Sequence, residues 1–94
     1  MTRAVLADAV LAESDRVRVV EGNVYFPSED VDRRYLIESD THSWCYWKGR
    51  ASYYHVRAGD LFLPDAAWCY PKAWPLARWL RGYVAFSSGI EIRP

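Results

Sequence analysis

The chain has 94 residues, which is enough for one domain and too few for a second independent core. Apolar residues make up 51% of it and charged residues 26%, a balance that excludes a disordered chain or a fibrous repeat. Twelve basic residues offset twelve acidic ones, so the net field that draws proteins to nucleic acid or to anionic membranes is missing. We therefore expect a single domain, residues 1–94, that binds no nucleic acid and no membrane.

The N-terminal segment MTRAVLADAVLAESD has neither a charged leader before a continuous apolar run nor a cleavage site. No stretch of the chain approaches the length needed to cross a bilayer. The sequence therefore predicts a cytoplasmic protein. Two cysteines, Cys45 and Cys69, make no disulfide framework, and we expect both as reduced thiols.

The first third of the chain predicts two β-hairpins. Apolar pairs at 5–6 and 10–11 flank the turn at 7–9, and a valine-rich run at 17–20 leads through 21–23 to a second apolar run at 24–26. Pro27 then ends strand pairing. Ser28 is a suitable N-cap residue, and the acids after it predict one helical turn.

The rest of the chain predicts more short strands and one helix. Strands are expected at 35–37, 51–57, 61–63, 66–70, 83–86 and 90–92, with a polar loop at 39–43. Proline is expected to stop the strands at Pro64 and Pro71. LARWLR, between Pro75 and Gly82, has helical spacing and is the one predicted helix. Strands at this regular spacing favour a mainly β sandwich or closed sheet.

Four segments also carry a family resemblance, EGNVYFPSEDV, CYWKGRASYY, DAAWCYPKAWP and RGYVAF. In order and spacing they resemble domain-of-unknown-function family 427, whose members are sometimes labelled predicted nucleotidyltransferases. The family's most specific block falls on Cys45, Tyr46, Trp47, Lys48, Gly49, Ala51 and Tyr53, and Tyr46 stands where the family usually has proline. The resemblance implies curved antiparallel sheets similar to the Mss4-like tent fold, with one short helix near the C-terminus.

The nucleotidyltransferase label would require carboxylates that hold a divalent metal, usually after a Gly-Ser loop. The candidate pairs are Asp30 with Asp32 and Glu38 with Asp40, and neither follows such a loop. The alternative interpretation places the first pair in a helical turn, where negative charge is favoured, and the second in a loop.

Two further chemistries involve the thiols. His42 and Cys45 have zinc-ligand spacing, with Cys69 or His55 as added ligands, but paired Cys-x-x-Cys knuckles are missing and we predict no metal and no cofactor. Cys45 lies close in sequence to Lys48, whose charge would favour a thiolate. Cys45 and His55 are therefore candidate catalytic residues, and the alternative is a small buried hydrophobe at position 45.

The aromatic residues predict a ligand site. Tryptophan and tyrosine stack on planar molecules, and a lysine can pair with an anionic group. The candidate ligand-binding residues are Trp47, Lys48, Tyr53, Trp44, Trp68 and Tyr70. We thus expect a small anionic or planar ligand in an aromatic pocket. The alternatives left open are an enzyme, an interaction module or homo-oligomer exposing Trp74 or Trp79, and rings that only fill the core.

Overall fold

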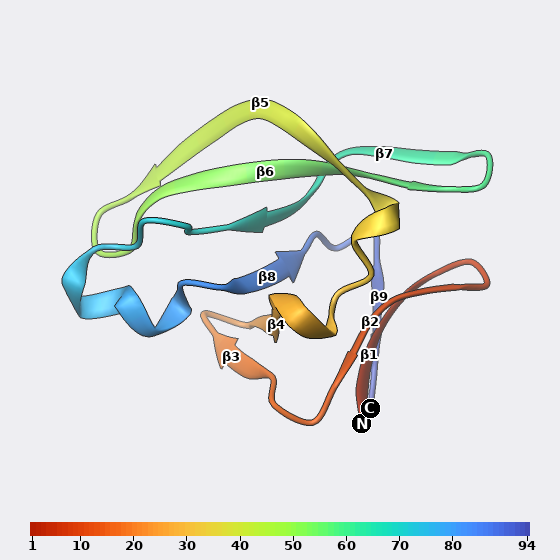
Figure 1. The fold of residues 1–94 in the computed structure, drawn as a ribbon, viewed down its shortest axis with the longest axis horizontal. Helices are drawn as coiled ribbons and strands as arrows, with labels where there is room; N and C mark the ends of the chain where they lie inside the picture. Colours follow the sequence, from red (N-terminus) through yellow and green to blue (C-terminus); the bar gives the residue numbers. More distant parts are fainter.

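A computed structural model describes residues 1–94 as a mainly β protein, as the sequence predicts (Figure 1). The strands are β1 (Thr2–Leu6), β2 (Ala9–Ser14), β3 (Arg18–Val20), β4 (Asn23–Pro27), β5 (Leu36–Cys45), β6 (Gly49–Ala58), β7 (Leu61–Cys69), β8 (Tyr83–Phe86) and β9 (Glu91–Arg93). Three short 3₁₀ helices join them, η1 (Ser28–Asp30), η2 (Arg33–Tyr35) and η3 (Pro75–Leu80). None of these helices has the length and apolar character needed to cross a membrane.

The strands form two antiparallel sheets. The smaller sheet has the order β2-β1-β9 and brings the two termini side by side, and the larger has the order β3-β4-β8-β7-β6-β5 (Figure 1). Both predicted hairpins are confirmed as β1–β2 and β3–β4. The turn between β3 and β4 has positive φ at Glu21 and Gly22, 54° and 81°, the geometry of the two-residue turns that match strand twist.

Two hydrophobic clusters cover opposite faces of the larger sheet, because successive side chains along a strand alternate between faces. The first joins the two sheets and includes Ala4, Leu11, Ala12, Phe26, Val56, Ala67, Val84 and Phe86. The second lies against η3 and the segment before it, and comprises Tyr25, Ala51, Tyr70, Ala73, Ala77, Leu80 and Ala85. The larger sheet is therefore the middle layer of the molecule.

The predicted helix at Pro75 is a 3₁₀ segment instead. Ala77 and Leu80 are its buried residues, and their i, i+3 spacing places them on one side of a three-residue turn. Leu76 is 82% exposed, so the apolar pattern that suggested an α-helix does not describe a buried face. The likeness to the Mss4-like tent fold stays a prediction.

Three local expectations were wrong. Residues 39–43 are not a loop but part of β5, which bulges away from β6 between Glu38 and His42. Pro64 does not end a strand, because β7 continues through it. Pro64 lies where the β6–β7 register shifts, and a missing N–H removes no ladder bond at a bulge. Ser28 is the first residue of η1, and Pro27 holds the cap position without a side-chain bond.

Candidate functional site

The aromatic cleft is a hollow of about 490 Å³ at one end of the larger sheet. It is lined by Tyr46, Trp47, Trp74, Pro75 and Leu76. The first two belong to the turn between β5 and β6, and the others to the segment that enters η3. A hairpin turn and a distant part of the chain thus form its opposing walls.

Backbone contacts fix Trp74 against the hairpin. Its backbone N–H donates to the carbonyl oxygen of Lys48 at 3.0 Å. Gly49 has φ +100°, and a Cβ atom at that position would lie 3.1 Å from the Trp74 ring. The ring of Trp44 packs against the ring of Trp74, with the two ring centroids 6.2 Å apart. The Lys48–Gly49 pair therefore holds Trp74 as one wall of the cleft.

The Lys48 side chain is buried, with 5% of the residue exposed, and does not line the cleft. Its ammonium group pairs with the carboxylate of Glu21 and lies 5.2 Å from the ring centroid of Trp47 and 5.3 Å from that of Tyr70. Burial disfavours the ammonium form, but the hydrogen bond to Glu21 and the charge interactions with Tyr25, Tyr70 and Cys45 together outweigh it and raise the pKa of Lys48. Lys48 is thus a buried, charged residue that contacts the Trp47 ring and helps to position it.

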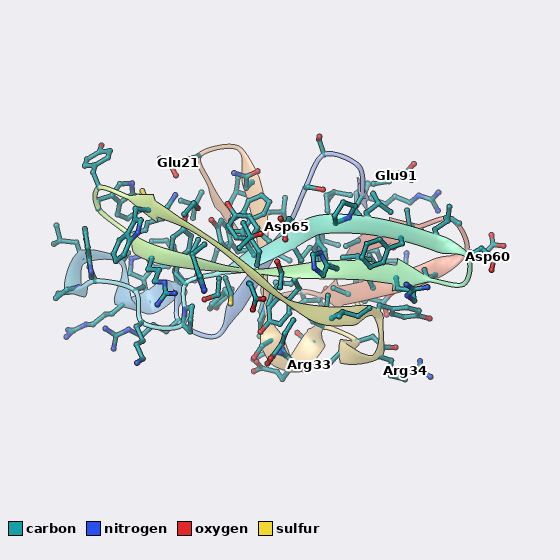
Figure 2. The ribbon with its side chains drawn as sticks, turned by 90° about the horizontal axis from the view of Figure 1, so that it is seen from above. Glu21, Arg33, Arg34, Asp60, Asp65 and Glu91 are labelled. Carbon is teal, nitrogen blue, oxygen red and sulfur yellow. The ribbon has the colours of Figure 1, made fainter.

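Glu21 reaches Lys48 from the tip of the β3–β4 hairpin, which Figure 2 shows extending from the sheet. Its φ of 54° is in the left-handed region, which a glutamate seldom adopts. The hydrogen bond from Lys48 holds the pKa of the Glu21 carboxyl below its usual range. The ion pair therefore ties this hairpin to the β5–β6 turn.

The other sequence candidates for ligand binding lie beneath the cleft or beside it. Trp68 and Tyr70 belong to the core cluster under η3, where the Trp68 Nε1–H donates to the hydroxyl of Tyr25 at 3.2 Å. Tyr53 packs against Trp68, with centroids 6.3 Å apart, and its hydroxyl lies 2.9 Å from Ser43 Oγ. Of these aromatic candidates only Trp47 lines the cleft, Trp44 packs against the Trp74 ring, and the others lie in the layer below.

Sequence reasoning missed the second wall. Trp74, Pro75 and Leu76 were assigned to a helix or to a partner surface, because their pairing with the β5–β6 turn is a long-range contact. The available signal was Gly49, since a glycine inside an aromatic run marks close approach of another group. It could not say which group approached.

The candidate catalytic residues are not assembled into a constellation. Cys45 is partly buried against the second core cluster. His42 Nδ1 lies 3.1 Å from the carbonyl oxygen of Ala51, and His55 Nδ1 accepts the backbone N–H of Asp65 at 3.0 Å. Both histidines are thus hydrogen-bonded to backbone groups, and neither is hydrogen-bonded to Cys45.

The paired carboxylates are each engaged by arginine. Arg16 bonds Asp30 at 3.2 Å, and Arg34 bonds Asp32 at 2.7 Å. A hydrogen bond from Ser14 lowers the pKa of Asp30, and one from Arg34 lowers that of Asp32. No group of three or more His, Cys, Asp and Glu side chains is placed to hold a metal ion.

Comparison with known proteins gives a family but no activity. A family model described as a domain of unknown function, DUF427, matches residues 1–92. No curated protein matches the chain.

Proposed function

The chain belongs to the DUF427 family, and on the geometry of its cleft we propose that it binds a planar small molecule between Trp47 and Trp74. One observation carries the proposal, the pair of tryptophans that face a common hollow of about 490 Å³ and are each held in place by Lys48. A hollow of this volume, lined mainly by apolar rings, is typical of small-molecule sites.

The cleft favours a planar ligand over an anionic one. Its lining carries no charged side chain, and the nearby ammonium of Lys48 is already paired with Glu21. A ligand stacked on Trp47 would use the same indole ring that the Lys48 ammonium contacts. Lys48 therefore acts as a positioning residue in this proposal, and a ligand carboxylate would have to displace Glu21 to reach it.

The test follows the five tryptophan indole N–H signals of ¹⁵N-labelled protein by NMR during titration with indole and, separately, indole-3-acetate. We expect saturable shifts at Trp47 and Trp74 with both probes, while Trp79, which lies outside the cleft with Arg18 over its ring, is unchanged. Trp74→Leu should abolish the shifts and Trp79→Leu should retain them.

Two other outcomes would revise or reject the proposal. Tighter binding of indole-3-acetate that disappears in Lys48→Met would favour the anionic ligand class. Shifts that stay linear with probe concentration, or that are equal in the two tryptophan variants, would contradict a site in the cleft.

Self-association through the same surface is a second candidate, favoured by the exposure of its rim. Tyr46 is 91% exposed and Leu76 82% exposed, and apolar side chains gathered in this way are typical of protein contacts. Sedimentation velocity should then show a concentration-dependent dimer that Tyr46→Ser removes. A monomer at every concentration would exclude this candidate.

A further inference from the structure

A second, more polar hollow lies on the opposite face of the larger sheet, the face that packs against the first cluster. Its volume is about 180 Å³, and its lining includes Ser28, Arg33, Tyr54, Cys69 and Tyr83. An adjoining hollow of about 270 Å³ shares Tyr54, Cys69 and Pro71 with it. We call the first of these the Arg33 hollow.

A row of directly paired residues forms the floor beneath both hollows. His42 on β5 pairs with Ser52 on β6, Ser52 with Cys69 on β7, and Cys69 with Val84 on β8. Paired residues of an antiparallel sheet project from the same face, so these four side chains line up across four strands. Small side chains in the row leave the space that larger ones would fill.

Arg33 is the only charged residue that lines the Arg33 hollow. Its guanidinium donates to the Tyr54 hydroxyl at 3.0 Å and lies 5.4 Å from the centroid of that ring. No carboxylate lies within salt-bridge distance of it, whereas the adjacent Arg34 is paired with Asp32. Figure 2 shows the two arginines at separate positions along the same border of the molecule. Arg33 is thus oriented by an aromatic ring and still has unpaired donors.

The other groups around the Arg33 hollow add hydroxyls and no negative charge. Ser28 and Tyr54 each bring a hydroxyl that can donate a hydrogen bond, whereas the Tyr83 hydroxyl accepts from Arg18 on the other face of the sheet. Burial raises the pKa of the Cys69 thiol, which opposes formation of a thiolate. One cation with two hydroxyls and no carboxylate is a lining suited to an anion.

We propose that the Arg33 hollow binds the oxyanion group, phosphate or carboxylate, of a small molecule. The planar guanidinium of Arg33 meets two oxygens of such a group, and Tyr54 holds it in that orientation. The rest of the ligand extends along the row toward His42. There the Nδ1 atom faces the carbonyl oxygen of Ala51 and must carry the proton, which leaves Nε2 of the neutral ring as an acceptor for a ligand hydroxyl or amino group.

The experiment titrates ¹⁵N-labelled protein with sodium phosphate and, in a second arm, with sodium acetate, at constant ionic strength. Backbone amide shifts of Ser28, Tyr54 and Gly82 report on the Arg33 hollow, and those of Trp74 report on the aromatic cleft. We expect saturable shifts at the first group and none at Trp74. The arm that saturates at the lower concentration identifies the oxyanion.

Arg33→Gln should weaken the apparent affinity by about tenfold or more, because a charge-assisted hydrogen bond is lost. Arg34→Gln is the matched control, since it removes one positive charge at the next residue but from a guanidinium already bound to Asp32. It should leave the affinity unchanged, and Tyr54→Phe should weaken binding by a smaller factor. Both arginines are exposed, so neither variant should prevent folding.

Non-saturable shifts in both arms would overturn the proposal, as would an equal loss of affinity in Arg33→Gln and Arg34→Gln. These results are independent of the aromatic cleft, which is probed by different signals and different ligands.

Discussion

Lys48 and Gly49 are neighbours in the chain but position the two walls of the cleft by different means. The Lys48 ammonium lies over Trp47, its carbonyl holds the backbone of Trp74, and the missing side chain of Gly49 leaves room for the Trp74 ring. The sequence predicted that Lys48 and Trp47 would share a site. It could not show that the lysine is buried, because the partner that neutralises it, Glu21, is 27 residues away in the chain.

Substitutions of Lys48 should separate the contribution of its packing from that of its charge. We expect Lys48→Met to change the free energy of unfolding by about 1 kcal/mol or less, because a buried ion pair is often replaced by an apolar side chain at little cost. Lys48→Ala should lose about 2–3 kcal/mol, because it also leaves a cavity beneath Trp47. Urea unfolding followed by far-UV circular dichroism measures both, and equal losses would mean that the charge dominates.

Gly49→Ala should destabilise the protein and displace Trp74. The positive φ and the ring 3.1 Å from the new Cβ together predict a loss of about 1–3 kcal/mol and a changed tryptophan emission maximum. Gly59→Ala is the control, because φ is also positive there but no atom lies within 4 Å. Its expected loss is about 1 kcal/mol, with unchanged emission. Equal effects at the two glycines would show that the contact with Trp74 has no cost.

At the scale of elements, the largest difference from expectation is the irregular pairing of β5, β6 and β7. Asp65 on β7 has φ 51° and accepts hydrogen bonds from Ser39 Oγ at 2.5 Å and Thr41 Oγ1 at 2.7 Å. It therefore binds the part of β5 that bulges away from β6. Composition alone predicted a polar loop at 39–43. It could not reveal a strand there, because the carboxylate that orders the segment is more than 20 residues away in the chain.

Asp65 gives this region a predicted dependence on acid. The hydrogen bonds from Ser39 and Thr41 hold the pKa of the Asp65 carboxyl below its usual value of 3.8. The unfolded chain then binds a proton at higher pH than the folded one, so this stabilisation is complete above the usual value and is lost as pH falls through the folded pKa. Asp65→Asn should reduce the loss of stability over that range in acid-unfolding curves.

Asp60→Asn is the matched control for this acid effect. Asp60 lies at the β6–β7 turn, far from Asp65 in Figure 2, and makes no side-chain hydrogen bond or ion pair. It should leave the shape of the acid-unfolding curve unchanged. If both variants flatten the curve equally, net charge sets the acid dependence, rather than the hydrogen bonds from Ser39 and Thr41 to Asp65.

At the scale of the whole molecule, the two clusters make the larger sheet the shared layer. Both hairpins followed from local turn chemistry. The joining of β1 to β9 and the covering of the other face by η3 were not predictable, because each pairs segments from opposite parts of the chain. The cleft and the Arg33 hollow lie on opposite faces of this layer.

The first cluster should make the two sheets unfold as one unit. Leu11, on β2, is fully buried against residues of the larger sheet, and Leu11→Ala should cost about 3 kcal/mol. All five tryptophans lie outside the smaller sheet, so their fluorescence reports on the rest of the molecule. Urea transitions followed by fluorescence and by far-UV circular dichroism should coincide and shift together in this variant.

The control is Leu76→Ala, at an 82% exposed residue, which should change the free energy of unfolding by about 0.5 kcal/mol or less. A dichroism change that precedes the fluorescence change in Leu11→Ala would mean that the smaller sheet unfolds independently, and that the larger sheet and its cleft are stable without it.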